Sequence, residues 1–146
     1  LLDLLHQAIQ QVKTMYPAIH TDIDIRIAPE ITQIKTDQYL LLHCIVNIVE
    51  NAMVYSKDAS SKITLEAKLE TEKKVKIKIT DQGLGIDTEI IPKIFDMFYR
   101  GTERSKGTGL GLYITQIAMN KLDGSIEVSS EGTNKGATFV LNLPIR

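Results

Sequence analysis

The sequence predicts an α+β fold in which a mixed β-sheet packs against helices. In three segments, apolar residues recur at the spacing of one helix face. In five others they alternate with polar residues, as in half-buried strands. The strand segments cluster without strict strand–helix alternation, which argues against a purely parallel sheet.

The first half of the chain is expected to form a helix, a strand and a second helix. Residues 1–15 carry apolar residues at helical spacing, and Pro17 ends that helix. Isoleucines alternate with charged residues over 23–27, which predicts a strand. A short extended piece at 33–35 should then lead, through an aspartate cap, into a long helix over 37–55.

The second half is expected to form a hairpin, two helical stretches and a final strand pair. Two alternating runs joined by a charged turn, 63–69 and 75–79, predict the first hairpin. After a glycine-rich turn we expect a short helical stretch, a polar loop, a helix and two strands, over 89–97, 101–108, 110–121, 125–129 and 137–143.

Length and composition indicate one globular domain spanning residues 1–146. The 43% apolar and 24% charged fractions exclude a disordered chain as the main interpretation. The net charge of −1 gives no basic excess for a phosphate backbone, so nucleic acid is not an expected partner. No apolar run is long enough to cross a bilayer, and no signal peptide is recognised. Because the sequence begins without methionine, we expect it to be a piece of a longer protein.

The cysteine and the histidines show no metal-ligand pattern. Cys44 lies among apolar residues and is expected to be a small buried side chain. His6, His20 and His43 do not have the spacing of a zinc site.

Residues 47–56, NIVENAMVYS, lie on the long predicted helix. Asn47 and Asn51 are four positions apart, so both amides share one helix face, and Tyr55 follows one turn later. Asparagine is a poor helix former, so the pair needs a reason. One reason is a solvated face or a structural amide network. The other is a set of oxygen ligands for a hard cation such as Mg²⁺.

Residues 79–87, ITDQGLGID, run from a strand directly into two glycines. Asp81 at the strand end is positioned to accept a hydrogen bond from an N–H group of a ligand. Gly83 and Gly85 would let the backbone approach that ligand closely. A tight turn with no ligand is the plain alternative.

Gly107, Gly109 and Gly111 precede or open the predicted helix over 110–121. Glycines at a helix N-terminus favour phosphate binding through backbone N–H groups. The spacing is not that of the dinucleotide fingerprint, because position 114 is isoleucine. The P-loop and the protein-kinase motifs are also absent from the sequence. A nucleotide site here would therefore belong to neither common class.

Taken in this order, the three segments resemble the ATP-binding domain of sensor histidine kinases, within the wider gyrase and heat-shock chaperone ATPase superfamily. Residues 47–56 resemble the N box, and 81–85 and 107–111 resemble the two glycine boxes. Residues 94–100, IFDMFYR, are similar to the F box, and 136–139, GATF, to the closing motif. The resemblance covers essentially the whole chain.

The resemblance implies a three-layer-type α/β sandwich, in which a mixed sheet of about five strands is covered on one face by about three helices. It implies ATP and Mg²⁺ as cofactors. Asp81 would bind the adenine amino group with help from Thr138, Asn51 would hold Mg²⁺, and Tyr55 and Ile86 would line the base. The implied ATP-binding residues are Asn47, Asn51, Tyr55, Asp81, Gly83, Gly85, Ile86, Phe98, Arg100, Gly107, Thr108, Gly109, Leu110, Gly111, Leu112 and Thr138.

By the same resemblance, residues 107–112 would form a lid over the triphosphate, with Phe95 and Phe98 anchoring its base. Three cations are available to meet phosphate there: Arg100, Arg104 and Lys106. Lys106 is favoured because it adjoins the first glycine of the lid. Asn47 and Lys106 are the implied catalytic residues.

Two positions differ from what such proteins commonly carry. Val54 stands where the N box usually has a basic residue, so lid cations are expected to compensate. Asn47 stands where the hydrolysing members have a carboxylate, and an amide cannot act as a general base. Glu50 lies about 100° round the helix from Asn51 and should point elsewhere. Poor water activation suits transfer of the phosphoryl group to a histidine.

The acceptor histidine is expected outside this sequence, because none of its three histidines has an H-[DE]-x-R-x-P-like setting. The resemblance thus implies the catalytic domain of a two-component sensor histidine kinase. Its partners would be the dimerisation and phosphotransfer domain of its own parent and a response regulator. We expect a cytoplasmic, monomeric fragment of a homodimeric parent that could be membrane-anchored. Two alternatives stay open: a serine kinase of the anti-sigma-factor type, and a nucleotide-responsive binding module without phosphotransfer.

Overall fold

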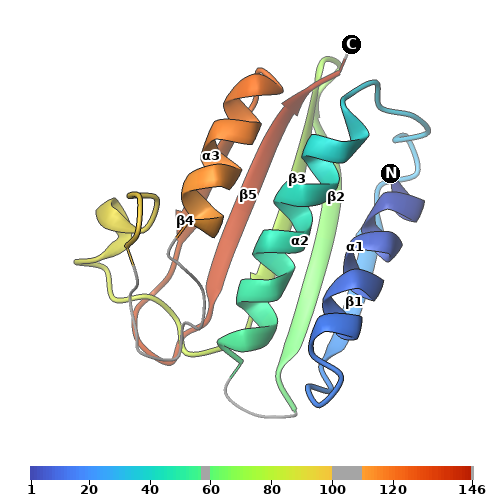
Figure 1. Ribbon diagram of the computed structural model, residues 1–146. Helices are drawn as coiled ribbons and strands as arrows, with labels where there is room; N and C mark the ends of the chain where they lie inside the picture. Colours follow the sequence, from blue (N-terminus) through green and yellow to red (C-terminus); the bar gives the residue numbers. More distant parts are fainter. Residues whose placement is uncertain (57–59, 100–109, 146) are drawn as a thin grey trace.

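The computed structural model describes residues 1–56, 60–99 and 110–145. Its elements follow the predicted order of helix, strand, helix, hairpin, short helical turn, helix and hairpin (Figure 1). Their bounds are α1 (Leu2–Met15), β1 (Asp22–Ile27), α2 (Gln38–Val54), β2 (Lys62–Thr71), β3 (Lys74–Asp81), the 3₁₀ helix η1 (Ile91–Lys93), α3 (Gly111–Lys121), β4 (Ser125–Ser129) and β5 (Ala137–Pro144).

The five strands form one mixed sheet in the order β1-β2-β3-β5-β4. β1 pairs with β2 in parallel, with Ile25 opposite Leu65, and the other neighbours are antiparallel. A parallel pair needs a long crossover connection, which α2 supplies between β1 and β2. The predicted mixed sheet of five strands is therefore confirmed.

The three helices lie side by side on one face of this sheet (Figure 1). Strand alternation explains why only that face is covered. In β3, Val75, Ile77 and Ile79 are buried toward the helices, whereas Lys76 and Lys78 project to the other face. Lys76 forms a surface ion pair with Glu70 at 2.7 Å. The predicted helix-covered sandwich is confirmed.

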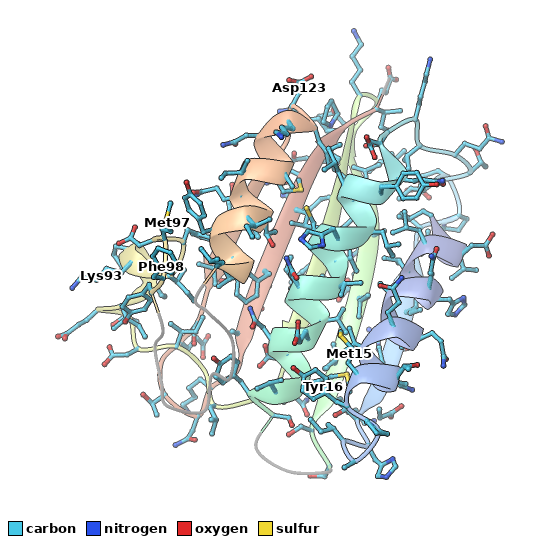
Figure 2. All side chains as sticks on the ribbon, in the orientation of Figure 1. Met15, Tyr16, Lys93, Met97, Phe98 and Asp123 are labelled. Atoms are coloured by element: carbon cyan, nitrogen blue, oxygen red, sulfur yellow. The ribbon has the colours of Figure 1, made fainter. Side chains whose placement is uncertain are left out.

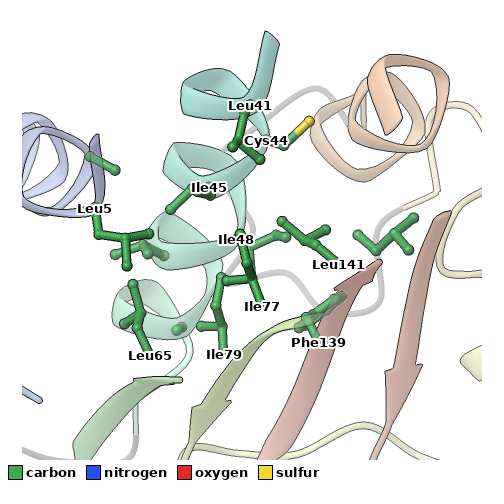
Figure 3. Packing of buried hydrophobic residues seen from close by; sticks show 14 of the residues in the cluster. Leu5, Leu41, Cys44, Ile45, Ile48, Leu65, Ile77, Ile79, Phe139 and Leu141 are labelled. Carbon is green, nitrogen blue, oxygen red and sulfur yellow. The ribbon is translucent and has the colours of Figure 1, made fainter. Parts of the chain in front are cut away.

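The main core lies between α2 and the middle of the sheet (Figure 3). Ile45 and Ile48 of α2 and Ile77 of β3 are among its fully buried side chains. Cys44 is also fully buried, as predicted, and burial raises the pKa of its thiol to about 11. α2 is thus held rigidly, so the polar residues on its remaining face have defined positions.

The structure differs from the sequence prediction in two elements. Residues 33–35 pair with no described strand; Ile34 instead packs against the core from an irregular segment. The helical stretch expected over 89–97 is reduced to η1 and turns, and it closes at Phe98, whose backbone is left-handed with φ of 63°. α3 ends at Lys121, as the predicted range of 110–121 requires, and Asp123 follows in a left-handed conformation with φ of 57°. Within the described ranges, no helix is long and apolar enough to span a membrane.

Candidate functional site

Asp81 lies at the end of β3 with one carboxylate oxygen fixed by the backbone. Its Oδ1 accepts hydrogen bonds from the backbone N–H of Gly83 at 2.9 Å and of Ala137 at 3.2 Å. Ala137 is available because β5 pairs with β3 in a register that places it opposite Asp81. Oδ2 has no hydrogen-bond partner among the described residues, so it is left to accept from a ligand.

Burial raises the pKa of Asp81 above its ordinary value, and the two backbone N–H groups partly oppose this shift. The surroundings therefore favour the neutral form more than water does. A ligand N–H group that reaches Oδ2 would restore some of the solvation that the carboxylate has lost. The site therefore suits a ligand that offers an N–H donor at this point.

The loop after Asp81 is pressed against the end of α2. Leu84 N–H donates to the carbonyl oxygen of Tyr55 at 2.9 Å. A Cβ on Gly83 would collide with that same Tyr55 carbonyl, so the close approach requires glycine. This contact brings Tyr55, the residue that caps the C-terminus of α2 one turn after Asn51, next to the loop that follows Asp81.

A second loop, the turn between β4 and β5, is bonded to the first through Ser130. Ser130 Oγ accepts from the backbone N–H of Ile86 at 3.0 Å and donates to the carbonyl of Gly136 at 2.6 Å. Gly136 N–H in turn donates to the carbonyl of Gly83 at 3.2 Å. The two glycine-containing loops are therefore hydrogen-bonded to each other and form one wall beside Asp81.

Asn51 and Thr138 complete the polar side chains near this wall. Asn51 is half-buried on the last turn of α2, and its side chain has no hydrogen-bond partner in the described part of the chain. Thr138 lies in β5 opposite Thr80, with their hydroxyl oxygens 3.4 Å apart. In the described ranges, no group of three or more His, Cys, Asp or Glu side chains is placed so that it could hold a metal ion.

Asn47 faces α3, as a structural amide network would require. Its Nδ2 lies 3.1 Å from Thr115 Oγ1 and 3.3 Å from both the Gly111 carbonyl and His43 Nε2. The amide thus joins the middle of α2 to the first turn of α3. The asparagine pair was expected to form either a structural amide network or a set of cation ligands. A structural network is seen at the Nδ2 atom of Asn47, but not at Asn51.

Glu50 turns away from these residues, as predicted from its position on the helix. Its carboxylate accepts a hydrogen bond from the Tyr16 hydroxyl, at the end of α1. It is therefore occupied on the α1 side of α2.

The remaining predicted site residues divide into three groups. Ile86 is buried beside the wall, and Leu110 and Leu112 are half-buried around the start of α3. Phe98 is 63% exposed and stands out from the body of the protein (Figure 2), whereas Phe95 is half-buried against the core. The others lie outside the described residues: Arg100, Arg104, Lys106, Gly107, Thr108 and Gly109.

Two residues of this region were not predicted from the sequence as part of the site. Ser130 sits in a polar turn where nothing distinguishes it from its neighbours. Thr115 could have been found from the sequence, because it lies on the same helix face as Ala118, Met119 and Leu122, where an apolar residue is expected.

Known proteins show the same fold and related sequences. The family described as histidine kinase-, DNA gyrase B-, and HSP90-like ATPase matches residues 36–146. The signal transduction histidine-protein kinase AtoS of Escherichia coli is 35% identical over 142 residues, which are 97% of this chain and 23% of that protein. The chain thus spans about a quarter of the length of this relative.

Solved structures agree with that match. The mycobacterial sensor histidine kinase MprB superposes with a TM-score of 0.84 at 22% identity, covering 99% of this chain and 93% of that one. Full-length ShkA in complex with AMPPNP superposes with a TM-score of 0.84 at 22% identity, covering 98% of this chain and 29% of that one. The chain therefore belongs to the histidine kinase-, DNA gyrase B- and HSP90-like ATPases, and its fold is that of the catalytic domain of a histidine kinase.

Proposed function

We propose that this chain is the catalytic domain of a two-component sensor histidine kinase, which binds Mg·ATP and transfers the γ-phosphoryl group to a histidine on a separate domain of its parent protein. Membership in an ATPase family and the likeness to named histidine kinases support this proposal. The observation that carries it is the Asp81 carboxylate, held by two backbone N–H groups at Oδ1 and without a hydrogen-bond partner at Oδ2 among the described residues.

The adenine would lie against the wall formed by the two loops. Asp81 Oδ2 would accept a hydrogen bond from the exocyclic amino group, with the Thr138 hydroxyl nearby. Tyr55 and Ile86 would pack against the base, since they flank Asp81 on α2 and on the loop after β3. Gly83 and Gly85 keep side chains out of this approach.

The phosphates would extend toward the first turn of α3. This helix begins at Gly111 with no side-chain cap from the described residues, so backbone N–H groups of its first turn would be available to anionic oxygen. Gly107, Thr108 and Gly109 would continue this contact as a lid, and Arg100 and Lys106 would supply positive charge. Phe98 would pack against the lid rather than against the core.

Asn51 fits a role as a protein ligand of Mg²⁺. Its amide is half-buried, unpartnered in the described chain and on the turn that contacts the Asp81 loop. An amide oxygen suits this cation, which usually relies on few protein groups together with phosphate and water. When bound, Mg²⁺ would neutralise charge on the phosphate oxygens.

In the transfer, the bond between the γ-phosphorus and the β–γ bridging oxygen breaks, and a bond from phosphorus to an imidazole nitrogen forms, leaving ADP. No water needs to be activated. This agrees with Asn47, whose amide cannot take a proton, and with Glu50, whose carboxylate is bonded to Tyr16. The parent would act as a homodimer in the cytoplasm, where ATP is available, and a response regulator would receive the phosphoryl group from the histidine.

Labelling with γ-³²P ATP tests this function. The isolated chain should bind Mg·ATP in calorimetry but remain almost unlabelled, because the acceptor is expected on another domain. The full-length parent should acquire label that is lost in acid, as expected for phosphohistidine. Strong acid-labile labelling of this chain alone, or failure to bind ATP, would contradict the proposal.

A further inference from the structure

Thr115 is a buried hydroxyl that connects α2 with α3. Its side chain has no exposed surface, and it occupies a core-facing position of α3. The hydroxyl donates to the Gly111 carbonyl at 2.8 Å and lies 3.1 Å from Asn47 Nδ2. A buried hydroxyl without partners would be costly, so these two bonds explain how a polar side chain is accepted here.

The donor and acceptor roles in this cluster determine how the Asn47 amide is turned. The Thr115 hydroxyl has one proton, which it gives to the Gly111 carbonyl. It can therefore only accept from Asn47, so the amide nitrogen must face α3. The Gly111 carbonyl, 3.3 Å from the same nitrogen, requires the same orientation.

The oxygen of this amide is consequently the free end. Asn47 Oδ1 has no hydrogen-bond partner among the residues that the structure describes. Asn51 follows one turn later on the same face of α2, where its amide is also unpartnered by described residues. Without the hydroxyl, the amide nitrogen of Asn47 would keep only its longer contacts, at 3.3 Å, with the Gly111 carbonyl and His43 Nε2, so the amide would be held less firmly.

We propose that Thr115 is a positioning residue for the phosphate end of the nucleotide site. By holding Asn47 Nδ2, it presents Asn47 Oδ1 to the bound nucleotide, and by holding the Gly111 carbonyl it sets the start of α3. The inference rests on the proposed function, because it assumes that the phosphates lie between α2 and this end of α3.

Two substitutions separate the hydroxyl from the shape of the side chain. Thr115→Val keeps the volume and removes both bonds, and Thr115→Ser restores the hydroxyl. Thr21→Val is a matched control, because the Thr21 hydroxyl is buried and has no hydrogen-bond partner in the described structure. The full 146-residue chain is used throughout.

The first readout is the side-chain amide of Asn47 in NMR spectra of the chain without ligand. Its signals should shift in Thr115→Val, return toward wild type in Thr115→Ser and stay unchanged in Thr21→Val. The second is calorimetry with two probes. Thr115→Val should bind Mg·ATP about three- to tenfold more weakly, with adenosine affinity unchanged, and Thr115→Ser should recover most of the loss.

The outcomes distinguish this inference from the proposed function. Equal weakening of adenosine and Mg·ATP in Thr115→Val, or no change in the Asn47 signals, overturns the positioning role and leaves the proposed function standing. A wild-type chain that binds neither probe contradicts the proposed function and the positioning role together, even if the Asn47 signals respond to Thr115→Val.

Discussion

The hydroxyl of Tyr16 donates a hydrogen bond to Glu50 Oε1 at 2.5 Å, across 34 positions of the chain. Tyr16 is the first residue after α1, and Glu50 lies on α2 directly before Asn51 (Figure 2 labels Tyr16 beside the end of α2). The bond therefore ties the first helix to the helix that carries the candidate metal ligand. It also raises the pKa of Tyr16 to about 12, with burial and the negative charge of Glu50 adding to the shift.

Replacing Tyr16 by phenylalanine should lower the free energy of unfolding by about 1 kcal/mol at pH 8, because a hydrogen bond to a carboxylate is lost and solvent weakens that bond at this half-buried position. Urea denaturation measures the difference. Tyr39→Phe is the control, since Tyr39 is 76% exposed and its hydroxyl makes no hydrogen bond within the described residues. Equal effects of the two substitutions would show that the Tyr16 bond contributes nothing.

The same pair predicts a pH dependence at high pH. The pKa of Tyr16 is higher in the folded chain, at about 12, than its ordinary value of 10.0. The stabilisation is thus complete below pH 10 and is lost as the pH rises toward 12. The difference in unfolding free energy between wild type and Tyr16→Phe should shrink across that interval. A difference that stays constant from pH 8 to 11.5 would contradict the assignment.

Asp81→Asn should weaken ATP binding by about 1.5–3 kcal/mol, because a charge-assisted hydrogen bond to the adenine amino group is lost. GTP should be affected less, since guanine has a carbonyl at that position. Calorimetry with both nucleotides measures the two losses. Equal losses would mean that Asp81 has only a structural role.

The same variant should be no less stable than wild type without ligand. Asparagine keeps an oxygen for the N–H groups of Gly83 and Ala137 and removes a buried charge. Because the folded pKa of Asp81 is raised, the carboxyl group stabilises the fold most at low pH, and this contribution falls as the pH rises through the folded pKa. Thermal unfolding at pH 7 should show an equal or higher midpoint for Asp81→Asn, and a clear decrease would disprove this account.

Asn51→Ala should reduce the increase in ATP affinity that Mg²⁺ produces, because one oxygen ligand is removed. Binding of ADP without metal should hardly change, since Asp81 remains. Titrations of ATP and ADP with and without Mg²⁺ give both quantities.

Asn47→Ala is the comparison for this test. It should affect the Mg²⁺ increment less than Asn51→Ala, since Asn47 Nδ2 is engaged with α3. If both asparagines had only a structural role, either substitution would instead lower the melting temperature and weaken the binding of all nucleotides equally. An intact Mg²⁺ increment in Asn51→Ala would refute the ligand role.

Gly85→Ala should destabilise the chain by about 1–3 kcal/mol or more, because its φ is +69° and an added Cβ would collide with the Gly132 carbonyl. Gly132→Ala is a comparison for backbone strain alone, because its φ of +121° also disfavours alanine but no described atom lies within 4 Å of the added Cβ. Urea denaturation of both variants separates collision from backbone strain. A Gly85→Ala chain as stable as wild type would show that the added Cβ is accommodated and that the close contact between the two loops does not require glycine.

Local pattern alone determined the three long helices, the five strands and the family resemblance, but not the segments 33–35 and 89–97. The alternation in β2, β3 and β5 and the helical spacing in α1 and α2 are properties of neighbouring residues, and the observed elements end within a few positions of their predicted bounds. The glycine boxes could be recognised because close backbone approach leaves glycine as the acceptable residue.

Tertiary structure alone decided which groups meet. The second bond to Asp81 Oδ1 comes from Ala137, 56 positions away, and depends on the pairing of β3 with β5. Asn47 looked equivalent to Asn51 in the sequence, yet the packing of α3 on α2 engages its amide with Thr115 and leaves that of Asn51 free of described partners. Hydrogen bonds between distant segments depend on strand order and helix packing, which no local spacing encodes.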